Sequence, residues 1–251
     1  MILVKVVILC GGKGLRMRGL AEDVPKVLAK VNGQPIIWHI MKHFSRYNHN
    51  HFILPVGYKG DQIKEYLMDY SWRHHDFEMN LGENKYSLLD ELESWKITCV
   101  DTGQDTMTGA RIKMVEDFVD DDTFFVTYGD GLADIDLDEL LKFHKQKGKT
   151  VTLTGIKKNS QYGVLTVDQG IATNFTEKPM LDDTINGGFF VCNKQFFNYL
   201  SENPECVLEE EPLKSLVKAR ELAVYEHDGL WISIDTPKDL EEANRLWTIP
   251  Q

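Results

Sequence analysis

The chain contains 251 residues, of which 42% are hydrophobic, and this content argues for a folded core and against an intrinsically disordered protein. Its formal net charge of −11 argues against a general nucleic-acid binder, because such a protein needs a basic surface that neutralises phosphates. No uninterrupted apolar run approaches the roughly 20 residues of a membrane-spanning helix, so we expect a soluble, cytoplasmic protein with no membrane partner.

The first half of the chain alternates apolar runs with amphipathic segments. The apolar runs predict strands, at residues 4–9, 52–56, 97–100, 124–127 and 151–155. Helical periodicity lies between them, in a segment opened by Pro35 and at residues 61–70, 108–117 and 137–146. This alternation predicts parallel strands joined by right-handed crossovers, hence an α/β fold with a doubly wound, mostly parallel, Rossmann-like sheet.

The C-terminal third of the chain is richer in strands. Short apolar runs predict them at residues 163–167, 171–176, 187–191 and 222–225. We expect some of these strands to be antiparallel and to extend or cap the sheet. The apolar residues between 71 and 96 show neither a clear helical nor a clear strand periodicity, and no element is predicted there. The length fits a single domain over residues 1–251.

The negative charge is unevenly distributed along the chain. Residues 1–60 carry nine basic and two acidic side chains, a net charge of +7, so residues 61–251 carry −18. The four cysteines, at positions 10, 99, 192 and 206, have no C-x-x-C spacing and are typical of reduced thiols. The charge asymmetry predicts one local basic region that meets an anionic ligand.

A glycine-rich, basic loop follows the first predicted strand. Its sequence is Gly11-Gly12-Lys13-Gly14-Leu15-Arg16, and Arg18 and Lys26 come after it. Glycines allow backbone N–H groups to approach a polyphosphate closely, and basic side chains neutralise that ligand. The loop matches neither the Walker A pattern nor G-x-G-x-x-G. We therefore predict a triphosphate-binding loop, with a solvated basic surface loop as the alternative.

Aspartates follow two apolar runs. Asp130 stands between two glycines after the predicted strand at 124–127, and Asp235 ends the run before Pro237. Ligands of doubly wound sheets bind outside the carboxyl ends of strands, where a carboxylate can hold a hard cation against a phosphate. The alternative is structural: Asp130 in a turn, and Asp235 as the cap of a last helix that starts at Pro237.

Weaker signals come from two turn-like motifs and a histidine pair. Glu177-Lys178-Pro179 follows the predicted strand at 171–176, and Asn186 precedes two glycines. Both motifs suit an anionic or polyol ligand, and both are also ordinary turn chemistry. His39 and His43 have a spacing that can bind zinc, but no H-E-x-x-H pattern is present, so we interpret them as packing or surface residues.

Taken in chain order, these motifs resemble those of the sugar-phosphate nucleotidyltransferases. The motifs are Gly11-Gly12-Lys13-Gly14-Leu15-Arg16, Pro25-Lys26, Gly129-Asp130-Gly131, Glu177-Lys178-Pro179 and Asp235-Thr236. Longer strings at residues 35–42, 57–60 and 185–190 are most similar to the cytidylyltransferases of this family. The resemblance covers nearly the whole chain. It implies CTP and a phosphorylated acceptor, such as the hexose phosphate glucose 1-phosphate, as substrates, Mg²⁺ as cofactor, and a homo-oligomer.

The resemblance also implies a role for each candidate residue. The triphosphate would be held by Gly11, Gly12, Gly14, Arg16 and Lys26, of which Arg16 and Lys26 would be catalytic. The nucleotide would be placed by Thr108, Gly109 and Arg111, and Mg²⁺ would be held by Asp130 and Asp235. The acceptor would be bound by Tyr128, Glu177, Lys178 and Asn186. Residues 1–150 would thus form the nucleotide-binding half and residues 151–251 the acceptor-binding half.

Several alternatives stay open. Leu15 and Val27 replace the Thr and Pro usual in the family, which leaves room for another acceptor or another nucleoside triphosphate. A nucleotide-sugar-dependent glycosyltransferase would use a D-x-D pattern, which the acidic residues at 134–138 contain; a simpler interpretation is that they favour the N-terminus of the following helix. A non-catalytic nucleotide-binding subunit would be expected to lack Lys26 or one of the two metal carboxylates.

Overall fold

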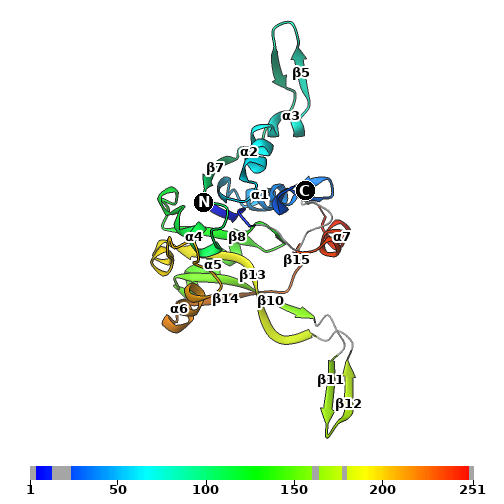
Figure 1. Ribbon diagram of the computed structural model, residues 1–251, viewed down its shortest axis with the longest axis vertical. Helices are drawn as coiled ribbons and strands as arrows, with labels where there is room; N and C mark the ends of the chain where they lie inside the picture. Colours follow the sequence, from blue (N-terminus) through cyan, green and yellow to red (C-terminus); the bar gives the residue numbers. More distant parts are fainter. Residues whose placement is uncertain (1–3, 13–23, 160–163, 177–179, 249–251) are drawn as a thin grey trace.

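The computed structural model describes residues 4–12, 24–159, 164–176 and 180–248. Its centre is a seven-stranded sheet with the strand order β14-β10-β13-β8-β1-β4-β7 (Figure 1). In chain order these strands are β1 (Val6–Leu9), β4 (His51–Val56), β7 (Lys96–Asp101), β8 (Thr123–Tyr128), β10 (Val151–Asn159), β13 (Met180–Asn193) and β14 (Leu222–His227). Each strand predicted for this sheet is therefore present.

Among the described strands of this sheet, one strand is antiparallel to its neighbours. β1 is parallel to β4 and β8, β4 to β7, and β10 to β14, whereas β13 is antiparallel to both of its neighbours, β8 and β10. The predicted α/β class, with a mostly parallel sheet and added antiparallel strands, is confirmed. The antiparallel strands were expected to extend or cap the sheet, whereas β13 lies inside it, between β10 and β8. Its residues Phe189 and Phe190 are buried in the core.

Helices connect and cover the strands. They are α1 (Ile36–Arg46), α2 (Gly60–Met68), α3 (Tyr70–His74), α4 (Thr108–Lys113), α5 (Leu137–Lys147), α6 (Glu211–Ala219) and α7 (Pro237–Leu246), with short 3-10 turns η2 (Lys26–Leu28), η3 (Glu116–Phe118) and η4 (Lys194–Tyr199). The predicted apolar stripe of α1 is fully buried at Ile36, Ile40 and Phe44. No helix in the described ranges combines the length and apolar character needed to cross a membrane.

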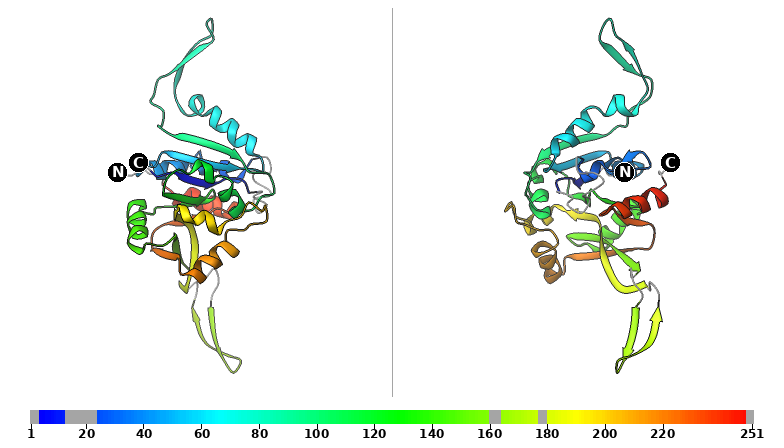
Figure 2. Two further views of the ribbon diagram at one scale, coloured as in Figure 1. Left: turned by 90° about the vertical axis from the view of Figure 1, so that its left-hand side faces the viewer. Right: turned by 45° about the vertical axis from the view of Figure 1, so that its right-hand side comes forward.

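Two hairpins project from opposite ends of the molecule (Figures 1 and 2). One is formed by β5 (Phe77–Asn80) and β6 (Lys85–Leu88), within the segment for which no element was predicted. The other is formed by β11 (Val164–Asp168) and β12 (Ile171–Thr176), which were predicted as strands. The residues of β5 and β6 are almost all exposed, so no buried face imposes a period on their sequence.

Two further two-stranded ribbons are short. β2 (Lys30–Val31) pairs with β3 (Gln34–Pro35), and β9 (Gly131–Ala133) pairs with β15 (Trp231–Ser233). The second ribbon joins distant parts of the chain, and the Ile234 N–H donates to the Asp130 carbonyl oxygen at 2.9 Å. It therefore brings the end of the last strand beside the end of β8.

Candidate active site

The carboxyl ends of β1 and β8 lie side by side at one edge of the central sheet. The two strands pair in parallel from Val6 with Phe125 to Leu9 with Tyr128. Beyond them, the Gly129 N–H donates to the Leu9 carbonyl oxygen at 3.1 Å, so the chain after β8 stays against the chain after β1. The glycine-rich loop and Asp130 therefore start from neighbouring points, as expected for a ligand site of a doubly wound sheet.

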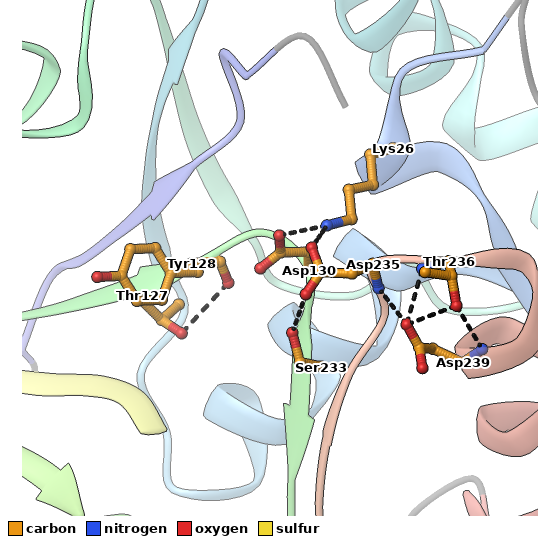
Figure 3. Close-up of polar contacts among 8 residues, drawn as sticks. All are labelled: Lys26, Thr127, Tyr128, Asp130, Ser233, Asp235, Thr236 and Asp239. Atoms are coloured by element: carbon orange, nitrogen blue, oxygen red, sulfur yellow. Dashed lines mark hydrogen bonds and ion pairs between the residues drawn. The ribbon is translucent and has the colours of Figure 1, made fainter. Parts of the chain in front are cut away.

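Lys26 bridges the two predicted metal carboxylates (Figure 3). Its Nζ donates to Asp130 Oδ2 at 2.6 Å and to Asp235 Oδ1 at 2.9 Å. The Lys26 side chain is only 12% exposed, whereas about a third of each carboxylate side chain is exposed. Three residues that are far apart in the sequence thus form one charged cluster with an open side.

The donor set of this cluster fits a magnesium ion that also binds phosphate. The two carboxylate oxygens contact the same nitrogen, so they lie no farther apart than the sum of the two bond lengths. No group of three or more His, Cys, Asp or Glu suited to a metal occurs among the described residues. Magnesium is commonly held by one or two carboxylates together with substrate phosphates and water, so two carboxylates suffice.

Asp235 is held in place by the start of α7. The N-cap of this helix is Thr236, whose hydroxyl accepts from the Asp239 N–H while Asp239 Oδ2 accepts from the Thr236 N–H. Asp239 Oδ2 also accepts from the Asp235 N–H at 3.0 Å, and Ser233 Oγ donates to Asp235 Oδ2 at 2.9 Å (Figure 3). Asp235 is therefore not the helix cap, which was the structural alternative for this residue.

A cavity of about 250 Å³ opens between the loop after β1 and the N-terminus of α4. Its wall includes the predicted nucleotide residues Gly11, Gly12, Lys26, Thr108 and Arg111, together with Tyr128 and Asp130. We call it the nucleotide-side cavity. The predicted site residues Gly14 and Arg16 lie outside the described residues.

Arg111 lies in the wall of this cavity but directs its donors to the protein. Its guanidinium donates to the Gly11 carbonyl oxygen at 3.0 Å, to Thr102 Oγ1 at 2.6 Å and to the Gly103 carbonyl oxygen at 2.9 Å. Burial lowers the pKa of Arg111 below its usual value. A Cβ on Gly11 would come within 2.2 Å of the guanidinium, so a larger residue there would force the Arg111 side chain to shift. Arg111 thus supports the loop after β1.

Thr108 and Gly109 begin α4, where the helix packs against residues 204–209. A Cβ on Gly109 would lie 2.8 Å from Cys206 Sγ, so this glycine permits the close approach of the two segments. Thr108 Oγ1 accepts from the Leu208 N–H at 2.9 Å and donates to Glu209 Oε2 at 2.8 Å. Of the two residues, Thr108 lines the nucleotide-side cavity, and Gly109 shapes the packing behind it.

A second cavity of about 250 Å³ lies on the other side of Tyr128 and Asp130. We call it the acceptor-side cavity; its wall includes Tyr128, Asp130, Asn186, Gly187, Trp231 and Ser233. The Tyr128 hydroxyl accepts from Asn186 Nδ2 at 3.1 Å and donates to Glu209. Burial, reinforced by Glu209, raises the pKa of Tyr128 above its usual value. The predicted acceptor residues Glu177 and Lys178 lie outside the described residues.

The two cavities meet at Tyr128 and Asp130, which line both. The Asp130 carboxylate, one of the two that contact Lys26, therefore lies where a ligand in one cavity would approach a ligand in the other. Such an arrangement suits a transfer between two bound substrates, because holding both reacting groups together removes much of the entropic cost of their encounter.

Residues near the site that were not predicted include Trp231, Ser233 and Glu209. Ser233 stands two residues before Asp235, and that proximity was an available signal. Trp231 donates from Nε1 to the Gly187 carbonyl oxygen at 2.8 Å, and both residues line the acceptor-side cavity. Glu209 belongs to an acidic run before α6. Acidic residues are expected at the N-terminus of a helix because they interact favourably with its dipole. Nothing in the local sequence therefore indicated that Glu209 contacts Thr108 and Tyr128.

The D-x-D segment and the histidine pair have structural roles. Asp136 is the N-cap of α5 and accepts from the Glu139 N–H at 3.0 Å, which is the simpler interpretation given above. His39 is buried, contacts the Val31 carbonyl oxygen at 2.7 Å and accepts from Trp247 Nε1 at 3.2 Å. Burial lowers the pKa of both His39 and His43. Of the packing and surface roles expected for these histidines, their burial agrees with packing.

Comparison with known proteins gives consistent matches over nearly the whole chain. The "Nucleotidyl transferase" family model matches residues 5–248. A Bacillus subtilis (strain 168) protein named "Probable glucose-1-phosphate cytidylyltransferase" is 50% identical over 243 residues, which cover 97% of this chain and 96% of that protein. The glucose-1-phosphate cytidylyltransferase of Salmonella typhi is 41% identical over 246 residues, with 97% and 95% covered.

Solved structures share the fold at lower sequence identity. HddC from Yersinia pseudotuberculosis superposes with a TM-score of 0.70 at 20% identity and covers 96% of this chain and 98% of its own. The inositol-1-phosphate CTP transferase from T. maritima gives a TM-score of 0.66 at 16% identity, with 98% of both chains covered. At these identities the similarity concerns the fold.

Proposed function

Because the chain belongs to the nucleotidyl transferase family, we propose that it transfers a cytidylyl group from CTP to a hexose 1-phosphate such as glucose 1-phosphate. The observation that carries the proposal is the cluster of Lys26, Asp130 and Asp235 at the junction of two cavities. The names of the relatives at 41–50% identity support the choice of CTP and of the acceptor.

The reaction needs alignment and charge neutralisation rather than a protein nucleophile. A phosphate oxygen of the acceptor attacks the α-phosphorus of CTP, a new oxygen–phosphorus bond forms, and the bond to the bridging oxygen of the β-phosphate breaks. Pyrophosphate leaves with that oxygen. The acceptor phosphate is already ionised near neutral pH, so no base has to remove a proton. Lys26 neutralises charge that develops on the α-phosphate.

Asp130 and Asp235 are the residues that would hold Mg²⁺. When bound, the ion would neutralise the phosphate oxygens and orient the α-phosphate for in-line attack. The nucleotide-side cavity would take CTP against Gly11, Gly12 and Thr108. The acceptor-side cavity would take the hexose phosphate against Tyr128 and Asn186. Arg16 and Gly14 on the triphosphate side, and Glu177 and Lys178 on the acceptor side, complete the proposed set.

The experiment is a pyrophosphate-release assay of CTP, UTP, dTTP and GTP with glucose 1-phosphate and a panel of other phosphorylated acceptors. We expect release with CTP and glucose 1-phosphate. Release with UTP or dTTP but not with CTP would contradict the base assignment, and release of a nucleoside diphosphate instead of pyrophosphate would contradict the reaction itself.

A further inference from the structure

The segment before α6 carries a carboxylate that contacts the walls of both cavities. Glu209 Oε2 accepts from Thr108 Oγ1 at 2.8 Å, and Glu209 Oε1 accepts from the Tyr128 hydroxyl. Thr108 lines the nucleotide-side cavity and Tyr128 lines both cavities. Glu209 itself is exposed, and it is not among the described residues that line either cavity. Any influence that it has on a ligand therefore passes through the two hydroxyls.

The chemistry of a carboxylate determines the direction of both hydrogen bonds. An ionised carboxylate only accepts, so Thr108 and Tyr128 must each donate the single hydroxyl proton to Glu209. Neither hydroxyl has a second proton to give to a ligand.

Each hydroxyl oxygen also accepts one hydrogen bond from the protein. The Leu208 N–H donates to Thr108 Oγ1 at 2.9 Å, and Asn186 Nδ2 donates to the Tyr128 hydroxyl at 3.1 Å. A hydroxyl oxygen has two lone pairs, so each keeps one for a ligand. The ligand group that it meets must be a donor, such as a sugar hydroxyl on the Tyr128 side and a hydroxyl or amino group of the nucleotide on the Thr108 side.

The backbone of this segment docks without the Glu209 side chain. The Met107 N–H donates to the Pro204 carbonyl oxygen at 2.8 Å, and the Ala110 N–H donates to the Cys206 carbonyl oxygen at 3.1 Å. Leu208, next to Glu209, is 1% exposed and anchors the segment in the core. Loss of the carboxylate is therefore expected to disturb the two hydroxyls much more than the fold.

We propose that Glu209 is a positioning residue that orients the Thr108 hydroxyl toward the nucleotide and the Tyr128 hydroxyl toward the acceptor, so that one carboxylate serves both substrates. This inference rests on the proposed function. It predicts that removal of the carboxylate weakens the binding of both substrates, whereas removal of either hydroxyl weakens the binding of one.

The test is a steady-state analysis of Glu209→Ala, with Glu210→Ala, a change at the neighbouring exposed glutamate, as the matched control. Glu209→Ala is expected to raise KM for CTP and KM for the hexose 1-phosphate, each by about tenfold, as for the loss of a charge-assisted hydrogen bond. The value of kcat is expected to change less than either KM, and the thermal midpoint to match that of the control. Glu209→Gln keeps a single acceptor oxygen and is expected to restore one of the two KM values.

Variants at the two hydroxyls separate a positioning role from a structural one. Tyr128→Phe is expected to raise KM for the hexose phosphate, and adding Glu209→Ala to it should raise that KM no further, because both changes remove the same interaction. Thr108→Val should behave in the same way toward CTP. Unchanged KM values in Glu209→Ala, effects equal to those of Glu210→Ala, or additive effects in the double variants would overturn the proposal.

A binding measurement keeps this inference separate from the proposed function. The dissociation constant for CTP can be measured by calorimetry without an acceptor and without turnover. Glu209→Ala and Thr108→Val are each expected to weaken CTP binding about tenfold, and no more when combined. Wild-type affinity in Glu209→Ala would contradict the positioning role even in an active enzyme. Failure of the wild-type protein to release pyrophosphate would contradict the function and not the positioning role.

Discussion

Lys26 is the single residue on which the proposed chemistry depends most. Its ammonium lies between Asp130 and Asp235 and reduces the repulsion between these two like charges. Lys26→Ala removes the charge that would also neutralise the α-phosphate, so turnover is expected to fall by about 10²–10³. Pyrophosphate release measures this, and Lys30→Ala, at an exposed lysine of β2, should keep the wild-type rate.

Asp235→Asn is expected to have a comparable effect, because it removes one of the two carboxylates that would hold Mg²⁺. The loss should appear as a lower kcat over the whole accessible range of magnesium concentration, together with a weaker apparent affinity for the ion. Ser233→Ala, which removes only a hydrogen bond to that carboxylate, should cost much less. Turnover near that of the wild type in Asp235→Asn would be incompatible with the assigned role.

His43 gives the protein a pH-dependent stability that does not involve the site. The residue packs against Tyr47 and Phe189, and burial lowers its pKa from 6.5 to about 4. Arg46 acts in the same direction and Asp134 opposes it. The unfolded chain therefore binds a proton between these two pKa values and the folded chain does not, so the free energy of unfolding falls as the pH drops from about 6.5 toward 4.

The variant His43→Phe removes this contribution. Between about pH 7 and pH 5 the wild-type protein should lose about 2 kcal/mol more stability than the variant, as follows from the two pKa values. Urea unfolding at both pH values measures it. The other buried histidines contribute equally to both proteins, so equal losses in the two would show that His43 is not the source.

At the scale of elements, the capping box of α7 links stability to the site. Thr236→Ala removes the hydroxyl that accepts from the Asp239 N–H and is expected to cost about 1 kcal/mol of stability. Asp239 also accepts from the Asp235 N–H, so loosening the cap should lower the rate as well. Denaturant unfolding and pyrophosphate release test both effects, and Thr236→Ser, which keeps the hydroxyl, should show neither.

The elements that end at the site could be predicted because buried strands impose strong patterns. The apolar runs before Gly11 and before Asp130 were visible in the sequence, and their parallel pairing brought these residues together as expected. The ribbon of β9 and β15 could not be predicted, since three-residue strands carry no period. The contacts of Glu209 with Thr108 and Tyr128 span about a hundred and about eighty residues of sequence, and no local pattern reports such pairs.

At the scale of the whole molecule, we predict that the exposed hairpin of β5 and β6 contributes to the contact between copies of a homo-oligomer. In the hairpin of β5 and β6, Phe77 lies opposite Leu88 and Met79 opposite Tyr86, so one face is apolar. Phe77, Met79 and Tyr86 are each at least 41% exposed. An isolated two-stranded hairpin has marginal stability in water, and burying this face against a second copy of the chain would stabilise it.

This prediction can be checked by the mass of the protein in solution. Light scattering of the wild-type protein is expected to give a mass above that of one chain. Met79→Lys places a charge on the apolar face and should shift the protein toward the monomer, whereas Ser87→Lys places the same charge on the opposite face and should not. A wild-type mass equal to that of one chain would contradict the prediction.

The central claim, that an acceptor phosphate oxygen attacks the α-phosphorus of CTP at the junction of two cavities, can be tested most directly with an isotope. Glucose 1-phosphate labelled with oxygen-18 in its phosphate is incubated with CTP, Mg²⁺ and the protein, and the products are analysed by mass spectrometry. We predict equal amounts of unlabelled pyrophosphate and of CDP-glucose that retains every oxygen-18 atom of the glucose 1-phosphate. Absence of CDP-glucose, or label in the pyrophosphate, would contradict this account.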